Sequence, residues 1–316
     1  MGRRPKWGRA IDGVFILNKD GGMTSNDALQ QVKRLFFAKR AGHTGSLDPL
    51  ATGVLPICLG EATKFSQYLL DADKTYRSTF RLGISTETGD CDGEEVERID
   101  ASSISKAQIL AALPQFTGLI EQIPSMYSAL KYQGKPLYKW AREGVSLPVE
   151  ARQSRQITVY RYEVLGFRGG EHPEVDVEVA CSKGTYIRTL AEDLGKLLGV
   201  GAHVIKLHRT EAGPFKIDDS VSVDVLKQKR GEGEPEVLDD SLMPMDMPVL
   251  HMPKAELTAD MKHYFCQGQP VMNSDVYRSA KEGDMVRVYV ETGQFLGVAS
   301  VNDGNIAPKR IVVEGC

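Results

Sequence analysis

The segment Gly42–Gly53 concentrates residue types that can do chemistry. It holds one imidazole (His43), one carboxylate (Asp48) and three hydroxyl side chains, with glycines at both ends and at position 45. Glycine adopts backbone conformations closed to other residues, and Pro49 keeps Asp48 out of the helical region. The pattern therefore predicts a loop that presents Asp48 on an extended backbone, where a carboxylate can attack a carbon or move a proton. A turn-capping role is the alternative for Asp48.

Other familiar chemistries have no matching motif. The chain has no phosphate-binding Gly-Lys-Ser loop, no dinucleotide fingerprint, no zinc motif and no nucleophile elbow. The run Asp90–Gly93 begins like a calcium loop, but Ala101 stands where the closing Glu is needed. The Thr88–Asp90 turn is the other loop that constrains an acid and could supply a second catalytic carboxyl, but we interpret it as a solvated surface loop. The sequence thus predicts a metal-free, cofactor-free site of Asp, Tyr, Arg and His, suited to carboxylate chemistry at an anomeric carbon.

The first half of the chain predicts alternating strands and helices around this loop. A helix with apolar positions Ala28, Val32, Leu35 and Phe36 is expected to end at Gly42, so that the loop begins at its C-terminus. A short helix is predicted near residues 61–70. Strands are predicted over residues 13–18, 54–59 and 76–82, with Tyr76 on the apolar face of the third.

The second half predicts a further helix–strand region, a linker and a small β module. A marked amphipathic helix is expected from Ile187 to Leu198, with Tyr186 and Arg188 in its first turn. Lys227–Pro253 is predicted to be a linker because it is rich in charge, Gly and Pro, with some of its apolar residues free to pack on a domain. The remaining predicted elements are a helix over 105–113, strands over 157–165 and 175–180, a helix over 257–266 and strands over 285–290, 295–300 and 310–313.

Composition is typical of a globular protein with about two domains at 316 residues. The net charge is −3, but acidic residues gather around residues 90–97 and 232–240, so the remainder is basic and an RNA partner is compatible with it. The five cysteines lack metal or redox spacing, which favours a reducing cytosol. No apolar run reaches signal-peptide or membrane-span length.

The loop motif resembles the catalytic loop of bacterial tRNA pseudouridine synthases of the TruB type. The resemblance runs in family order from Gly13 to Thr210, and Leu257–Val313 resembles the RNA-binding PUA module. Its further motifs are Gly60–Lys64, Lys74–Tyr76, Met126–Lys131, Ala141–Gly144, Ser182–Arg188, Gly201–His203 and Leu207. The chain departs from the family at Asp20 and Ser125, where proline is usual.

The resemblance implies a fold, a function and a partner. The expected fold is α+β, the pseudouridine synthase fold: a mixed, mostly antiparallel sheet with flanking helices and a central cleft, plus a β-barrel-like PUA module. The implied domains are 1–250 (catalytic, with the linker) and 251–316 (PUA-like). The implied reaction is cofactor-free isomerisation of uridine 55 in the T stem-loop of tRNA in the cytoplasm, with no membrane and no protein partner implied.

The resemblance also implies roles for site residues. Asp48 is the essential carboxylate, which either attacks C1′ or takes the 2′ proton to give a glycal. Tyr76 stacks on the uracil and accepts the C5 proton. Arg188 pairs with Asp48 and keeps it ionised and aimed. Without the resemblance, Arg188 would equally suit a phosphate contact at a helix start.

Three further residues are implied to handle the flipped base. His43 fills the stack that the base leaves, and Tyr186 and Leu207 frame the base. From the residues alone, His43 would more simply satisfy the last carbonyls of a helix, and Leu207 would be ordinary core. Lys19 and Lys64 are candidate phosphate contacts, although solvated lysines are the simpler interpretation.

Three other functions are open from the sequence. An RNA-binding protein with an inactive synthase domain would bind RNA without forming product, and a hydrolytic N-glycosidase would release free uracil. A structural scaffold would have no need for a carboxylate in a Gly-rich loop.

Overall fold

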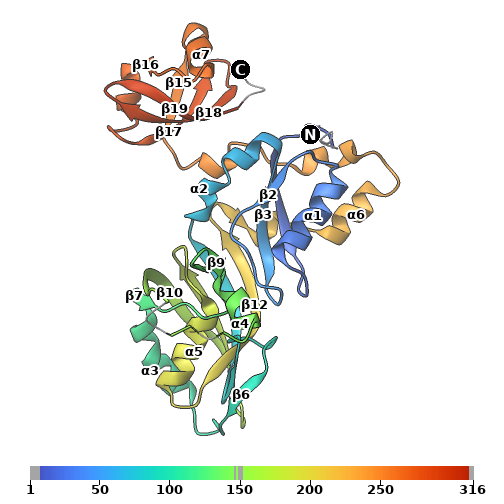
Figure 1. Cartoon of the computed structure of the whole chain (residues 1–316), viewed down its shortest axis with the longest axis vertical. Helices are drawn as coiled ribbons and strands as arrows, with labels where there is room; N and C mark the ends of the chain where they lie inside the picture. The colour runs from blue at the N-terminus through green and yellow to red at the C-terminus, as the bar shows by residue number, and fades with distance from the viewer. Residues whose placement is uncertain (1–7, 146, 149–151, 313–316) are drawn as a thin grey trace.

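The computed structural model describes residues 8–145, 147–148 and 152–312. Within them, a ten-stranded sheet and a five-stranded sheet carry most of the fold (Figure 1). In Figure 1 the five-stranded sheet lies at one end of the elongated molecule, beyond α2, and helices α3, α4 and α5 lie at the other end. Two short hairpins, β5–β6 and β8–β9, complete the strands of this part.

The large sheet has the strand order β14-β1-β3-β12-β4-β11-β10-β7, with β2 paired to β3 and β13 paired to β12. All its pairs are antiparallel except β1–β14 and β3–β12. The predicted mixed, mostly antiparallel α+β fold is therefore confirmed. The strands are β1 (Gly13–Lys19), β2 (Ala41–His43), β3 (Thr52–Leu59), β4 (Lys74–Leu82), β7 (Gly118–Gln122), β10 (Arg155–Arg168), β11 (Glu174–Cys181), β12 (Ala202–Ala212), β13 (Phe215–Lys216) and β14 (Val221–Ser222). The short hairpins are β5 (Ile84–Thr86) with β6 (Glu95–Arg98), and β8 (Lys131–Tyr132) with β9 (Lys135–Pro136).

Apolar periodicity explains how the sheet and its helices pack. In β11, Val175, Val177 and Val179 are fully buried and the intervening residues are more exposed, as a period of two requires. In α5, the apolar stripe that contains Leu190 and Leu194 is fully buried. The helices of this part are α1 (Ser25–Leu35), α2 (Gln67–Leu70), α3 (Lys106–Ala112), α4 (Leu137–Arg142), α5 (Ile187–Leu197) and α6 (Val223–Arg230), with 3₁₀ helices η1 (Gly60–Lys64), η2 (Leu113–Phe116), η4 (Ile217–Asp219), η5 (Pro235–Ser241) and η6 (Met247–Val249).

The entry to the Gly42–Gly53 loop differs from the prediction. Helix α1 ends at Leu35 rather than at Gly42, and Ala41–His43 form strand β2 against β3. Phe36 leaves the helix to pack against Phe15 with ring centroids 5.5 Å apart, and Phe37 turns the chain with a positive φ of 51°. The loop is thus held by the sheet at its start. The predicted helix over 61–70 is also wrong in detail, because it divides into η1 and α2.

The predicted linker is largely integrated into the fold. Its first residues complete α6, and η5 and η6 follow within it. Leu238 is fully buried in the main hydrophobic cluster, and Met243 exchanges two backbone hydrogen bonds with Val14 (2.9 and 2.8 Å). Apolar residues between the prolines of this segment account for its packing, although its charge and Gly content favour a linker.

The five-stranded sheet forms its own hydrophobic cluster and also contacts the larger part. Its strands are β15 (Lys254–Leu257), β16 (Val271–Met272), β17 (Met285–Val290), β18 (Phe295–Asn302) and β19 (Asn305–Ile311), with α7 (Ala259–Cys266) and η7 (Ser274–Arg278). Phe65, which follows η1, packs in one cluster with Val249 and Val298. The Lys64 ammonium donates to the Ile311 carbonyl (2.8 Å). The last predicted strand, over 310–313, lies instead mostly at 305–311, and residue 313 is outside the described residues.

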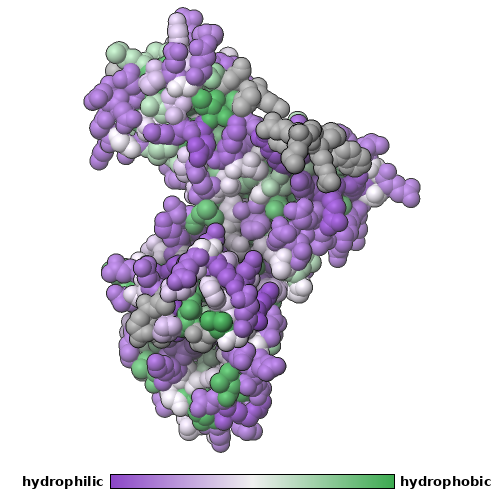
Figure 2. All heavy atoms as spheres, in the orientation of Figure 1, coloured by the Kyte–Doolittle hydropathy of each residue, from purple (hydrophilic) through white to green (hydrophobic). Residues whose placement is uncertain are grey.

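Figure 2 shows a mostly hydrophilic face with small, separate apolar areas over both sheets. Scattered apolar residues of this kind are ordinary on a protein surface. Among the described helices, none combines the length and the apolar character that a membrane span requires.

Candidate active site

The loop that carries Asp48 is fixed by backbone contacts on both sides. The Ser25 hydroxyl at the start of α1 accepts from the Leu47 amide (2.7 Å) and donates to the Leu47 carbonyl (3.0 Å). The Ala51 amide donates to the Asp48 carbonyl (3.0 Å), which closes a turn around Pro49. The sequence correctly predicted a loop here, and the structure supplies its anchors.

Lys19 holds the same loop from the end of β1. Its fully buried ammonium donates to the carbonyls of Asp20 (2.8 Å), Pro49 (3.3 Å) and Ala51 (2.7 Å). Burial lowers the pKa of Lys19 to about 8. Lys19 is therefore neither the solvated lysine that the sequence favoured nor the phosphate contact that was its alternative. The Lys64 ammonium binds Glu61 (2.6 Å) and the Ile311 carbonyl, and its contact with phosphate stays a prediction.

Arg188 joins two carboxylates that lie far apart in the sequence. Its Nε lies 3.0 Å from Asp48 Oδ2, and its Nη1 lies 3.4 Å from Asp90 Oδ2. The Arg188 and Asp90 side chains are each about 6% exposed, whereas that of Asp48 is 40% exposed. The guanidinium also donates to the carbonyls of Thr88 (2.9 Å) and Tyr127 (3.1 Å). Two backbone carbonyls and the buried Asp90 carboxylate thus hold Arg188 in place. The Asp48 carboxylate is left partly exposed to solvent.

Two opposing effects act on the Asp48 carboxyl. Burial raises the pKa of Asp48 above its ordinary value, and the Arg188 guanidinium acts in the opposite direction. The nearby Asp90 carboxylate adds to the rise. Arg188 is therefore the strongest of the nearby charges that favour the ionised form of Asp48, and Lys19 acts in the same direction.

Asp90 is the residue that the sequence interpretation missed. The Thr88–Asp90 turn was predicted to be a solvated surface loop, but Asp90 is only 4% exposed and accepts from the Thr88 hydroxyl and the Asp92 amide. Gly89 takes a φ of +72°, and a Cβ there would lie 2.7 Å from Glu192 Oε1. The tight approach of this turn to α5 is what brings Asp90 to Arg188. The Thr-Gly-Asp pattern was the available signal.

Tyr76 and His43 both lie near Arg209, a buried residue of β12 that the sequence interpretation also missed. Tyr76 lies opposite Arg209 in the pairing of β4 with β12. Burial raises the pKa of the Tyr76 hydroxyl, and the adjacent Arg209 guanidinium opposes that rise. Burial, with Arg209, lowers the pKa of His43, and His43 Nδ1 has no hydrogen-bond partner among the described residues. His43 is therefore a neutral ring at neutral pH, and it lies in β2 rather than at a helix end.

Tyr186 and Leu207 approach the site from two different elements. Tyr186 precedes α5, and its backbone amide and carbonyl both bind the Gln122 side chain (2.8 and 3.0 Å). Leu207 is 7% exposed in β12, two residues before Arg209. No hydrogen bond or ion pair joins either residue to Asp48 among the described residues.

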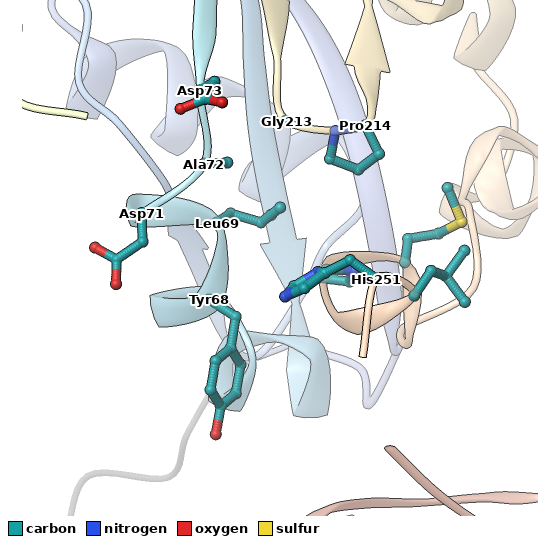
Figure 3. A pocket seen from close by; sticks show the side chains of 11 residues that line it. Tyr68, Leu69, Asp71, Ala72, Asp73, Gly213, Pro214 and His251 are labelled. Atoms are coloured by element: carbon teal, nitrogen blue, oxygen red, sulfur yellow. The ribbon is translucent and has the colours of Figure 1, made fainter. Parts of the chain in front are cut away.

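A separate cavity lies away from these residues. It has a volume of about 400 Å³ and is bounded by α2, the Gly213–Pro214 turn and the η6 region with His251 (Figure 3). None of the six predicted site residues lines it. Among the described residues, no cluster of His, Cys, Asp or Glu suits a metal ion.

Gly53, where the loop joins β3, cannot carry a side chain. Its φ is +101°, and a Cβ would lie 2.2 Å from the Arg209 carbonyl oxygen. We expect Gly53→Ala to lower the melting temperature and to slow catalysis, because the strand pair must shift. Gly22→Ala is the matched control, since it has a similar positive φ of +79° but nothing within 4 Å of the added Cβ. Equal thermal shifts in the two variants would contradict the steric argument.

Comparisons with known proteins identify the family. Residues 33–187 match the model for TruB family pseudouridylate synthase, N terminal domain, residues 188–250 match the tRNA pseudouridylate synthase B C-terminal domain, and residues 253–312 match Pseudouridine synthase II TruB, C-terminal. The chain belongs to the TruB family. TruB pseudouridine synthases are isomerases, so this chain is an enzyme that converts uridine in RNA to pseudouridine.

Curated TruB relatives match over nearly the whole chain. The tRNA pseudouridine synthase B of Saccharophagus degradans is 56% identical over 313 residues, which cover 99% of both chains. That of Pseudomonas aeruginosa is 50% identical and covers 96% of this chain and 97% of its own. The TruB resemblance inferred from the sequence motifs is thereby confirmed.

Solved structures support the same fold. The protein in the crystal structure of a Cbf5-Nop10-Gar1 complex has a TM-score of 0.71 and 26% identity, covering 98% of this chain and 91% of that chain. The archaeal box H/ACA sRNP Nop10-Cbf5 complex gives a TM-score of 0.69 at 25% identity, covering 98% and 92%. Both agree with the pseudouridine synthase fold expected for a TruB protein.

Proposed function

We propose that this protein converts uridine 55 in the T arm of tRNA to pseudouridine, with Asp48 as the catalytic carboxylate. The observation that carries the proposal is the contact of 3.0 Å between buried Arg188 and partly exposed Asp48. A buried guanidinium orients the carboxylate and favours its charged form, while the exposed side remains open to a substrate. The names of the curated relatives, tRNA pseudouridine synthase B, support tRNA as the RNA.

The reaction exchanges one bond of the sugar for another. The N1–C1′ bond breaks, the uracil turns over, C5 bonds to C1′, and the C5 proton is lost while N1 regains one. Asp48 supports either of two routes: attack on C1′, or removal of the 2′ proton to give a glycal. Both routes begin with an ionised carboxylate, which is the form that Arg188 favours.

The remaining predicted residues would receive the base outside the helix. In our proposal the Tyr76 ring stacks on the uracil, and its oxygen takes the C5 proton while its own hydroxyl proton passes to water. Tyr186 and Leu207 frame the base. His43 would replace the lost stacking, for which its neutral, flat ring is suited. Base flipping is required because C1′ and C5 cannot be rearranged within a stacked helix.

The proposal assigns two domains and one compartment. Residues 1–250 would form the catalytic domain, and residues 251–316 a PUA-like RNA-binding domain. A role in tRNA modification would place the protein in the cytoplasm. We propose that tRNA alone completes the site, without a cofactor or a protein partner.

The decisive experiment uses an unmodified T stem-loop hairpin of tRNA. Incubation with the protein should give pseudouridine at the position equivalent to uridine 55, mapped by chemical probing, and a hairpin with cytidine there should give none. Release of free uracil would instead indicate an N-glycosidase. Binding without any base change would indicate an RNA-binding protein with an inactive synthase domain.

The pH dependence follows from the Asp48 carboxyl. Because burial raises its pKa, Asp48 should become protonated at a higher pH than an ordinary carboxyl group. The rate should therefore rise with pH through an acid limb that lies at a higher pH than an ordinary carboxyl group would give, in single-turnover assays on the hairpin. Arg188→Gln should move this limb to higher pH, and a limb that does not move would contradict the assignment.

A further inference from the structure

Arg209 is a fully buried arginine without an acidic partner. It lies in β12 with 1% of its surface exposed, and no carboxylate within the described residues lies within ion-pair distance of its guanidinium. A buried charge is costly unless hydrogen bonds compensate it. The groups that accept from Arg209 therefore indicate what the side chain does.

Those acceptors lie within the Asp48 loop and just beyond it. Arg209 Nη2 donates to the Gly45 carbonyl (2.8 Å), three residues before Asp48. Its Nε donates to the Val54 carbonyl (2.8 Å), just after the loop enters β3. The planar Arg209 guanidinium thus links Gly45 to Val54 and fixes the distance between these two parts of the chain.

The same guanidinium lies beside the other groups proposed to meet the base. Arg209 lies opposite Tyr76 in the β4–β12 pair, next to the Tyr76 hydroxyl. Its charge also acts on His43 and Lys74. Because β3 pairs with β12 at Gly53–Arg209, the backbone of Arg209 adds a further contact to the loop.

We propose that Arg209 is a positioning residue that fixes the Asp48 loop and the Tyr76 hydroxyl in one arrangement. This inference rests on the proposed function. Arginine suits the role because its rigid fork of five donors serves several acceptors at once, which a lysine ammonium cannot do from one point. Arg209 does not touch the substrate, so its loss slows the chemical step and leaves RNA binding nearly unchanged.

The test compares Arg209→Ala with wild type in single-turnover reactions on the T stem-loop hairpin. The rate constant should fall about a hundredfold, because misplacement by about 1 Å has effects of that size. The Kd for the hairpin should change less than about threefold, since no phosphate contact is removed. Unfolding would lower the amplitude of product formation, whereas mispositioning lowers the rate constant. Added guanidinium should accelerate this variant and not wild type.

Arg230→Ala is the matched control. Arg230 also donates to a backbone carbonyl, that of Leu35 (2.8 Å), but it joins α6 to α1 and contacts no residue of the loop. Its rate constant should equal that of wild type. Should Arg209→Ala fail to fold, Arg209→Lys keeps the charge and should still lose about tenfold in rate.

The inference would be overturned if Arg209→Ala had the same rate constant as the Arg230→Ala control. It would also be overturned if Arg209→Ala changed only the Kd for the hairpin or only the amplitude of product formation. A folded Arg209→Lys variant with the wild-type rate would contradict it as well. A wild-type protein that makes no pseudouridine would reject the proposed function itself, and this inference with it.

Discussion

Asp48→Asn should abolish pseudouridine formation on the T stem-loop hairpin. The rate constant should fall by about 10⁴-fold or more, as when the nucleophile or base of an enzyme is removed. The amide oxygen of asparagine still accepts from Arg188 Nε, so the loop should keep its conformation. The hairpin Kd should stay within about threefold of wild type, because the substitution removes no phosphate contact.

Asp224→Asn provides the control for this substitution. Asp224 pairs with Lys227 at 2.9 Å on exposed helix α6, so its replacement also removes one carboxylate from an ion pair. Exposed pairs of this kind contribute little, so activity and melting temperature should stay at the wild-type level. Measurable turnover by Asp48→Asn above the level of an uncatalysed reaction would reject the catalytic role of Asp48.

Arg188→Gln should have the second largest effect. The substitution leaves Asp48 and buried Asp90 without the cation between them, so the Asp48 pKa rises and the carboxylate loses its orientation. We expect a loss in the single-turnover rate of about a hundredfold or more at neutral pH. The unfolding free energy should fall by about 3 kcal/mol, because Asp90 keeps its burial and loses its partner.

The matched variant is Arg77→Gln. Arg77 pairs with Glu178 at 2.9 Å, but its side chain is 63% exposed, so water replaces the lost contact. Denaturant unfolding should show a change of less than about 1 kcal/mol, with normal turnover. If Arg188→Gln also retained wild-type turnover, the pairing with Asp48 would have no part in catalysis.

Local patterns in the sequence were sufficient to predict much of the fold. The alternating valines of β11 and the apolar stripe of α5 are enough to predict which of their side chains are buried, because strand and helix periods are properties of short segments. The glycines and Pro49 likewise define the Asp48 loop without reference to the rest of the chain. Family motifs added Arg188 as the partner of Asp48, which the structure places at 3.0 Å.

What the sequence could not predict depends on contacts between distant segments. Asp90 looked solvated because its neighbours are polar, and only the approach of Gly89 to α5 buries it against Arg188. Arg209 and Lys19 are charged residues in strands, where local patterns favour exposure, and they are compensated by carbonyls of the loop. Their roles follow from strand pairing, which no single segment encodes.

The contact of Phe65 with the five-stranded sheet has a consequence for the boundaries of any shortened protein. Phe65 is fully buried, and its ring lies 5.1 Å from that of Phe295 across the junction. A chain that stopped at residue 250 would expose this ring to water, one residue beyond the η1 turn that continues β3. Such a fragment would carry an exposed aromatic ring close to the end of β3, the strand that follows the Asp48 loop, and would tend to aggregate. The described residues 251–312 thus complete the folded enzyme as well as extending its RNA-binding surface in our proposal.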